Sequence, residues 1–331
     1  MNKILTPLSF LLLVACNSTP KPAEEQLVQG EAQGTTYTIK YRGKEELNLK
    51  TQIDSLLTEI DLSLSTYLPT STISQLNNSD SALIDDKFKR MFELSKELNE
   101  TTDGAFDPTI GPLIKAWGFD YANPQRMDST IVDSLLQFCG FRNFELNGSK
   151  LMKSKKSATL NFNAIAQGYS VDLMADLLDR YKIENYYVEL GGEVKVKGKN
   201  GQGVFWRVGI DRPKDHNMER ELSAIVSLEN QSMVTSGNYR NFYEIDGKRY
   251  SHSLNPTTGY PAENTLLSVT VITEGCAEAD AFATAFMVMG LEKTKAFLND
   301  HPEIIACLIY SEGEQYGMFY SPILETKLKE L

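Results

Sequence analysis

Two oxygen-bearing side chains, those of Asp280 and Thr284, lie four residues apart in the mostly apolar segment 276–289. In a helix, residues at this spacing project from the same face, so a carboxylate and a hydroxyl would stand side by side. Both are hard oxygen ligands of the kind that Mg2+ takes, and this ion completes its coordination with water and substrate phosphates. The spacing alone leaves a plainer alternative open, because Asp and Thr at this separation are also common on helix surfaces.

A second segment that could bind a ligand runs from Thr102 to Pro112, with the sequence TDGAFDPTIGP. Glycine followed by Asp-Pro predicts a turn, and a turn exposes backbone N–H and C=O groups that can contact a ring edge or phosphate oxygens. The alternative is a connection between helices, with Asp107 as the N-cap and Pro108 at the first helical position. Capping preferences alone favour this alternative.

The third segment, YSHSLNPTTGYP from Tyr250 to Pro261, reads as a strand end followed by a turn rich in Asn, Pro and Gly. His252 in this segment could act as a general base or contact a phosphate near neutral pH. A histidine that is hydrogen-bonded for purely structural reasons is the alternative. His216 and His301 lie in polar surroundings, and we assign them no role.

The periodicity of the chain predicts the elements that must position these segments. Apolar residues at helical spacing predict helices at 49–64, 88–98, 164–181, 276–289 and 291–298. Short alternating runs between polar turns predict strands at 35–41, 186–190, 204–210, 222–228, 242–245, 266–272, 304–310 and 316–320. Helices grouped beside a strand-rich half, without regular βαβ alternation, indicate an α+β fold. No Gly-rich strand-to-helix turn marks a Rossmann or Walker nucleotide site.

Charge and cysteine content limit the functions open to these 331 residues. The formal net charge of -11 argues against nucleic-acid binding, which needs a basic stripe. An anionic ligand would therefore need a metal ion or backbone amides to hold it. Besides Cys16, the cysteines are Cys139, Cys276 and Cys307. Their odd number and the lack of CxxC spacing predict neither a zinc site nor a complete disulfide framework, although one pair could form in an oxidising compartment.

The N-terminal residues predict export and a lipid anchor. Lys3 precedes the apolar run 8–14, which is too short for a stable membrane span but typical of a signal peptide. The sequence LVAC that ends at Cys16 resembles a lipobox, so we expect residues 1–15 to be a leader and Cys16 to carry lipid; an accidental cysteine is the alternative. Residues 16–29, rich in Pro, Ser and Glu, are expected to form a flexible tether. Residues 30–331 would then face the periplasm or the cell exterior.

Taken together, these segments resemble the ApbE family, whose bacterial members are FAD:protein FMN transferases. The matching stretches cover nearly the whole body of the chain. In order, they are GTTY from Gly34, STYLPTSTISQLN from Ser65, GAFDPTIGPLIKAWGF from Gly104, NAIAQGYSVD from Asn163, ELGGEV from Glu189, WRVGI from Trp206, TSGNYR from Thr235, YSHSLNPTTGYP from Tyr250 and CAEADAFATAFMVMG from Cys276. The resemblance implies a strand-rich half packed with helices, with the flavin site in a cleft between the two parts.

The resemblance also implies roles for individual residues. Mg2+ would be bound by Asp280, Thr284 and the backbone carbonyl of Ala164. Tyr67 would lie against the isoalloxazine ring and His252 near the pyrophosphate. The remaining FAD contacts would be made by Ala105, Phe106, Asp107, Gln33, Asn161 and Gln167. The last three stand where Met, Asp and Lys are common in the family. Losing the lysine removes a charge that would face the phosphates, but we expect binding to persist because Mg2+ supplies most of the compensation.

The implied reaction is attack by a threonine hydroxyl of an acceptor protein on the FMN-side phosphorus of FAD, with AMP leaving. His252 is the candidate base, and Mg2+ would stabilise the charge that develops on the phosphates. Acceptors of this family carry a motif like Asp-x-x-Ser/Thr-x-Ala-Thr, as in subunits of sodium-pumping NADH:quinone oxidoreductase and related redox complexes. Two alternatives stay open: an Mg2+-dependent FAD pyrophosphatase that releases FMN and AMP, and a flavin-binding lipoprotein without catalysis.

Overall fold

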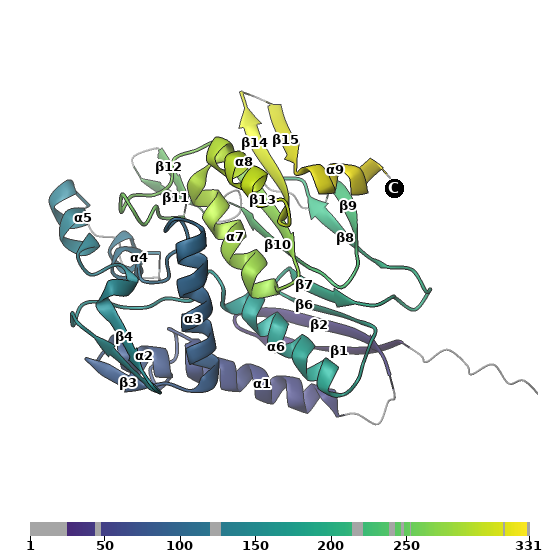
Figure 1. Ribbon diagram of the computed structural model, residues 1–331, viewed down its shortest axis with the longest axis horizontal. Helices are drawn as coiled ribbons and strands as arrows, with labels where there is room; N and C mark the ends of the chain where they lie inside the picture. The colour runs from purple at the N-terminus through teal and green to yellow at the C-terminus, as the bar shows by residue number, and fades with distance from the viewer. Residues whose placement is uncertain are drawn as a thin grey trace, which may run out of the picture.

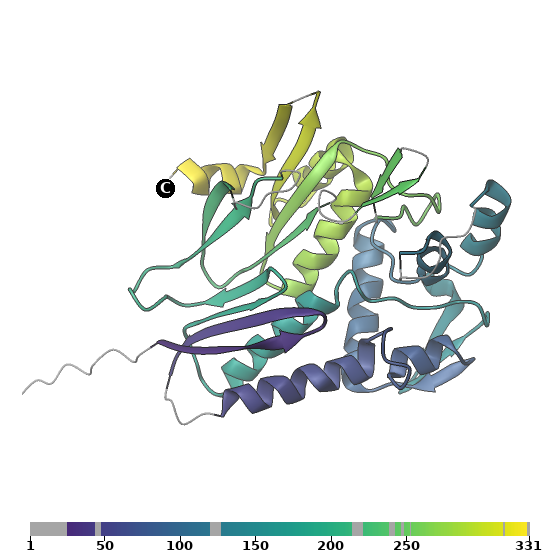
Figure 2. The same cartoon turned by 180° about the vertical axis from the view of Figure 1, so that it is seen from behind.

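The centre of the molecule is an eight-stranded antiparallel sheet with the strand order β1-β2-β6-β7-β10-β13-β14-β15. The computed structural model describes residues 25–43, 48–119, 127–213, 221–237, 242–245, 248–251, 253–313 and 315–329. The strands of the sheet are β1 (Glu25–Ala32), β2 (Thr35–Arg42), β6 (Tyr186–Leu190), β7 (Glu193–Lys197), β10 (Ser232–Gly237), β13 (Leu266–Thr273), β14 (Ile305–Glu312) and β15 (Gln315–Tyr320). Figures 1 and 2 show this sheet from its two sides.

The strand β14 is buried on both faces, which explains its continuous apolar sequence. Ala306 and Leu308 pack into the main core, on the side of the long helices. Ile305, Cys307 and Ile309 pack into a second core on the opposite side. Because successive side chains of a strand point to opposite faces, a strand between two cores needs apolar residues at every position.

Four long helices cover one face of the sheet. Helices α6 (Ala166–Arg180) and α7 (Cys276–Met289) lie against the strands, and α1 (Leu49–Leu64) and α3 (Asp86–Thr101) pack beside them (Figure 1). The sequence of α7 is rich in alanine, and its alanines at 277, 279, 281, 283 and 285 are all buried. Small side chains let α6 and the sheet approach this helix closely. In the described part of the chain, no helix combines the length and the apolarity needed to cross a membrane.

The opposite face is covered by the hairpin of β8 (Trp206–Asp211) and β9 (Leu222–Leu228) together with α9 (Pro322–Lys329). A smaller lobe lies at one end of the molecule, on the left in Figure 1. It contains α2 (Thr72–Asn77), α4 (Gly111–Trp117), α5 (Ser129–Leu136) and a three-stranded sheet of β3 (Ser81–Leu83), β5 (Lys150–Lys153) and β4 (Phe144–Asn147). The hairpin of β11 (Phe242–Ile245) and β12 (Lys248–Ser251), the 3-10 turn Phe141–Asn143 and α8 (Leu291–Asp300) complete the fold. The predicted α+β class is confirmed.

The strand β1 corrects the predicted tether. Residues 25–29, which we expected to belong to the tether 16–29, form the first part of β1. Glu25 lies opposite Arg42 and Gln29 lies opposite Thr38 in the register with β2. Composition misled here because an edge strand is held by backbone hydrogen bonds and needs few large apolar side chains. The folded body therefore begins by residue 25, whereas the predicted leader and Cys16 lie outside the described residues.

Most predicted elements are found within a few residues of their expected ends. The helix expected over 164–181 begins two residues later, at Ala166. The helix expected over 291–298 continues to Asp300, and the strand expected over 204–210 begins at Trp206. The three cysteines within the described segments, Cys139, Cys276 and Cys307, are all buried and none of them is in a disulfide.

Asp172 of α6 fixes three elements to each other. Its two carboxylate oxygens accept hydrogen bonds from the backbone N–H groups of Cys276 (3.0 Å) and Ala277 (2.9 Å) at the start of α7. The ammonium group of Lys195 in β7 lies 2.7 Å from the same carboxylate. Unpaired N–H groups at a helix N-terminus need such an acceptor, and a negative charge there also interacts favourably with the helix dipole. One side chain thus joins α6, α7 and β7.

We expect Asp172→Ala to lower the free energy of unfolding by about 2–3 kcal/mol, because it removes a helix cap and a charge-assisted hydrogen bond together. Urea denaturation followed by circular dichroism would measure the loss. Asp176→Ala, one turn later in α6, is the matched control. Its ion pair with Arg90 is exposed and 3.6 Å long, so its loss should cost less than about 1 kcal/mol. Equal losses in the two variants would contradict the assignment.

Candidate functional site

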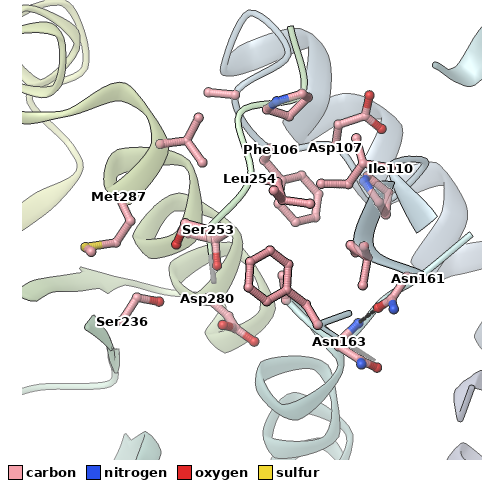
Figure 3. A pocket seen from close by; sticks show the side chains of 18 of the residues that line it. Phe106, Asp107, Ile110, Asn161, Asn163, Ser236, Ser253, Leu254, Asp280 and Met287 are labelled. Atoms are coloured by element: carbon pink, nitrogen blue, oxygen red, sulfur yellow. Dashed lines mark hydrogen bonds between the residues drawn. The ribbon is translucent and has the colours of Figure 1, made fainter. Parts of the chain in front are cut away.

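A cavity of about 270 Å³ opens where the segment before α4 faces α7 and the end of β10. Its lining includes Ala105, Phe106, Asp107, Asn161, Asn163, Ala164, Ser236, Ser253, Asp280, Thr284 and Met287. Figure 3 shows Asp280 and Met287 on one side of this cavity, and Asp107, Ile110 and Asn161 on the other. Residues from five separate stretches of the chain therefore meet at one place. We call it the first cavity.

Helix α7 presents Asp280 and Thr284 to the first cavity, as their spacing predicts. Ala164, just before α6, also lines it. A carboxylate, a hydroxyl and a carbonyl are hard oxygen donors, and such a set suits Mg2+. The residues present therefore fit the ion that the resemblance implies. The plainer alternative, an Asp–Thr pair on a solvent-facing helix surface, is wrong, because Asp280 is only 6% exposed.

The carboxyl of Asp280 lies in an electrostatically strained environment. Burial raises the pKa of Asp280 to about 7, against the opposing effect of hydrogen bonds from the Gly168 N–H and from Glu193. Burial and the neighbouring Asp280 together raise the pKa of Glu193 well above its usual range. Two buried carboxyl groups in contact cannot both be ionised without a compensating positive charge. A cation bound at Asp280 would supply that charge.

Gly168 allows α6 to approach α7 at the site. Its backbone N–H donates to Oδ2 of Asp280 at 3.3 Å. A Cβ atom at this position would lie 2.5 Å from the carbonyl oxygen of Cys276 and 2.9 Å from the Cα of Ala277. Real Cβ atoms do not approach backbone atoms so closely, so only glycine fits. The contact holds the start of α6, which follows Ala164, against the helix that carries Asp280.

A second cavity, of about 640 Å³, adjoins the first. Its lining includes Gln33, Asp61, Ser65, Tyr67, Asn163 and Gln167. Asn163 lines both cavities, so they are neighbours. The predicted FAD contacts fall into two sets: Ala105, Phe106, Asp107 and Asn161 line the first cavity, and Gln33, Tyr67 and Gln167 line the second. His252 lies outside the described residues, although the next residue, Ser253, lines the first cavity.

Asn163 also orders the boundary between the two cavities. Its side-chain amide donates to the hydroxyl of Tyr67 at 3.0 Å, and its backbone N–H donates to Oδ1 of Asn161 at 2.9 Å. The side chain of Tyr67 is 59% exposed, so ordinary core packing does not explain its position. The amide of Asn163 instead holds the phenol ring at the edge of the second cavity.

Gln33 occupies the turn between β1 and β2 with a left-handed φ of 51°. Its side-chain amide donates to Oγ of Ser170 at 2.8 Å. Its Oε1 is buried, and no donor in the described segments reaches it. Because a buried acceptor without a donor is costly, this oxygen is suited to accept a hydrogen bond from a ligand in the second cavity.

Asp107 does not cap a helix, so that expectation is wrong. Helix α4 begins at Gly111, and its N-cap is Ile110. The Oδ1 of Asp107 instead accepts a hydrogen bond from the N–H of Thr109 at 2.7 Å, closing a turn before the helix. The helix starts later than the capping pattern suggests, because this turn satisfies the Asp107 side chain locally. The segment does connect two helices, α3 and α4, as that alternative expects, and ligand binding by its backbone groups stays a prediction.

Two residues of the site, Asn163 and Glu193, were missed by the sequence reasoning. Asn163 opens the stretch NAIAQGYSVD, and Glu193 lies within ELGGEV, so both belong to stretches that match the family. The match to the family was a signal in the sequence, but an Asn or a Glu does not indicate one particular chemistry unless its side-chain contacts are known. An amide between two cavities and a carboxyl behind another carboxyl are recognisable only in three dimensions.

We expect Gly168→Ala to lower the free energy of unfolding by about 1–3 kcal/mol, because the added methyl group forces α6 away from α7. Gly275→Ala, at the start of α7, is the matched control, since its Cβ would meet its nearest neighbour at an ordinary 3.6 Å. Thermal and urea unfolding would compare the two variants. Should both behave like the wild type, the close contact at Gly168 would not limit the packing of the two helices.

We also expect Asp107→Asn to gain stability relative to the wild type as the pH rises. Burial raises the pKa of Asp107, so between about pH 4, where the unfolded chain releases this proton, and the higher folded pKa, the wild type loses stability with rising pH. The Asn side chain does not titrate and escapes this loss. Urea unfolding of both proteins at about pH 4 and at about pH 7 tests the sign. A difference that stays constant or shrinks with rising pH would contradict the expectation.

Comparison with known proteins agrees with this architecture. The family model described as the ApbE family matches residues 33–309. A protein from Vibrio cholerae serotype O1 named FAD:protein FMN transferase is 38% identical over 307 residues, which cover 89% of this chain and 90% of that protein. A protein of the same name from Escherichia coli K12 is 33% identical over 332 residues, covering 94% of this chain and 93% of that protein.

Solved structures show the same fold. The flavin transferase ApbE from Vibrio cholerae superposes with a TM-score of 0.82 at 34% identity, covering 93% of this chain and 100% of that one. The apo form of the flavinyl transferase ApbE from Pseudomonas stutzeri superposes with a TM-score of 0.84 at 31% identity, covering 93% and 98%. Sequence, fold and the matched span agree, and the chain belongs to the ApbE family.

Proposed function

We propose that this protein transfers FMN from FAD to a threonine hydroxyl of an acceptor protein, in an Mg2+-dependent reaction that releases AMP. The observation that carries the proposal is the meeting of Asp280, Thr284 and Ala164 on the cavity that Asp107 and Asn161 also line. The relatives named FAD:protein FMN transferase support the same reaction.

The charge of the two cavities supports a role for a metal ion. Their described lining residues include no Lys, Arg or His, whereas Asp61, Asp107 and Asp280 are all present. The pyrophosphate of FAD is itself an anion, so these side chains would repel it. Asp280, Thr284 and the carbonyl of Ala164 would hold Mg2+, which supplies positive charge to the phosphates when bound.

The two neighbouring cavities suit a long ligand with two ends. In this proposal Tyr67, oriented by Asn163, presents its ring to the isoalloxazine, and Gln33 offers its unpaired Oε1 as an acceptor. Ala105, Phe106 and Asp107 contact the ligand in the first cavity, and Asn161 and Gln167 take up further polar contacts. Such contacts hold the dinucleotide still, which is a large part of catalysis in phosphoryl transfer.

The reaction exchanges the phosphoanhydride bond of FAD for a phosphoester bond to the acceptor. The threonine Oγ forms a bond to the FMN-side phosphorus, and the bond from that phosphorus to the bridging oxygen breaks, so AMP leaves with this oxygen. The threonine proton passes to a base, for which His252 is the proposed residue. Ser253, its neighbour in the chain, lines the first cavity, which supports this choice.

The site of action and the partner belong to the same proposal. The signal-peptide and lipobox patterns before Cys16 support export and a lipid anchor on a bacterial membrane, facing the periplasm or the exterior. The acceptor would carry a motif like Asp-x-x-Ser/Thr-x-Ala-Thr, as in subunits of sodium-pumping NADH:quinone oxidoreductase. Such an acceptor would meet the enzyme on the same side of the membrane.

We expect Asp280→Asn to lower the rate of FMN transfer by more than about 100-fold, because it removes the anionic ligand of the metal site. Incubation with FAD, Mg2+ and an acceptor peptide, followed by mass spectrometry, detects the gain of FMN. Asp300→Asn, at the exposed end of α8, is the control and should transfer FMN at the wild-type rate.

The same assay separates the competing functions of the wild type. AMP with only free FMN would indicate a pyrophosphatase, and no AMP would indicate a flavin carrier; either result would contradict transfer. Full activity of Asp280→Asn would exclude the proposed metal site while leaving the transfer reaction in place.

A further inference from the structure

Glu193 is the first residue of β7 and lies on the helix-covered face of the sheet. Its neighbour Val194 packs into the second core, on the opposite face, as does Val196. Residues alternate along a strand, so Glu193 and Lys195 point toward α6 and α7. The ion pair of Lys195 with Asp172 of α6 confirms this direction. Strand alternation thus places a second carboxyl beneath the helix that carries Asp280.

The carboxyl of Glu193 reaches the candidate site only through Asp280. Lys195 pairs with Asp172 where α6 meets the start of α7, and Gly168 and Asp280 meet one turn away on the same two helices. Glu193, two residues before Lys195, is close enough to Asp280 for each carboxyl to shift the pKa of the other. Glu193 lines neither the first nor the second cavity, although Asp280 lines the first. Glu193 therefore contacts Asp280 from behind, on the side away from the cavity.

Stability does not explain a carboxyl at this position. The Oε2 of Glu193 is buried, and none of the described residues donates a hydrogen bond to it. A carboxyl with an unsatisfied oxygen beside a second carboxyl costs free energy, whereas an apolar side chain of similar size would pack at no such cost. Lys195, two residues further on the same face, has an ion partner and shows the stabilising arrangement that Glu193 lacks.

Asp280 needs such a neighbour if it is to bind a cation in one orientation. Within the described residues, the Asp280 carboxylate accepts a hydrogen bond from the Gly168 N–H at Oδ2, and at 3.3 Å this contact is long. One long bond leaves the plane of a carboxylate free to rotate. A second contact, from a different element, would fix the plane and leave the remaining lone pairs directed at the cavity.

We propose that Glu193 is a positioning residue that holds the Asp280 carboxyl in the orientation required for cation binding. This inference rests on the proposed function, since it takes the cation to bind at Asp280, Thr284 and Ala164. Hydrogen-bond partners behind a metal ligand orient that ligand, and their loss typically lowers metal affinity about 10–100-fold.

The test is a titration of the metal-free, full-length protein with Mn2+ in the presence of FAD, followed by electron paramagnetic resonance of the free ion. We expect Glu193→Ala to weaken Mn2+ binding about 10–100-fold. Glu193→Gln keeps the shape and the hydrogen-bonding capacity, so it should stay within about threefold of the wild type. Glu189→Gln is the control, since it removes a charge from the same hairpin but keeps the acceptor for the Gly192 N–H. It should bind Mn2+ like the wild type.

Two results would overturn the inference. Wild-type Mn2+ affinity in Glu193→Ala would show that Asp280 binds the cation without help from Glu193. An equal loss of affinity in Glu193→Gln would show that the negative charge of Glu193, and not its contact with Asp280, strengthens binding. If the Ala variant fails to fold, Glu193→Asp replaces it, since a side chain one methylene shorter draws the carboxyl back from Asp280. We expect it to weaken binding about 10-fold, and wild-type affinity in it would also overturn the inference.

Failure of the proposed metal site gives a different pattern. If the wild type and Asp280→Asn bind Mn2+ equally poorly with FAD present, the metal part of the proposed function is wrong. If the wild type binds, Asp280→Asn does not and Glu193→Ala does, only the role of Glu193 is wrong. Unfolding midpoints of all variants, measured without metal, show whether a loss of affinity reflects a loss of fold.

Discussion

The close contact between α6 and α7 is the constraint on which the site depends. Gly168 lets the two backbones meet, and the Gly168 N–H donates to the carboxylate of Asp280. One turn further along α6, Asp172 holds the first N–H groups of α7. Because Ala164 lies just before α6 and Thr284 lies one turn after Asp280 in α7, the same contact sets the spacing of the three proposed oxygen ligands. The site is thus a property of how two helices pack on one sheet.

Much of this architecture could be predicted from local patterns. The α+β class, the helix Cys276–Met289 and the shared face of Asp280 and Thr284 follow from residue spacing alone, because buried helices and strands have distinct periods. The strand β14 was also recognisable, since its continuous apolar run suits a strand between two cores. The proposed flavin contacts could be predicted only through the resemblance to a family, because a turn such as 102–112 would bind through backbone groups that carry no residue signature.

What could not be predicted depends on partners far apart in the chain. The first part of β1 was predicted to be a tether because its pairing with β2 uses backbone hydrogen bonds, which residue composition does not reveal. The role of Asn163 requires Tyr67, which lies 96 positions earlier. The partner of Glu193 lies 87 positions later, at Asp280. Asp107 was misread because its side chain satisfies the N–H of Thr109 two residues on, and a local turn competes with a helix cap for the same acceptor.

Two residues that differ from the family pattern, Asn161 and Gln167, affect the charge of the proposed site. The resemblance to the family puts Gln167 at the place of a common lysine, and the described lining of both cavities contains no basic side chain. Asn161 stands where aspartate is common, so one negative charge is lost together with one positive charge. The two changes compensate each other, so the net charge of this part of the site is the same as in the family pattern. Asn161 and Asn163 bring only neutral amides to the first cavity. Charge compensation for a dinucleotide would therefore fall to the cation, and the orientation of the Asp280 carboxylate would decide how well that cation is held.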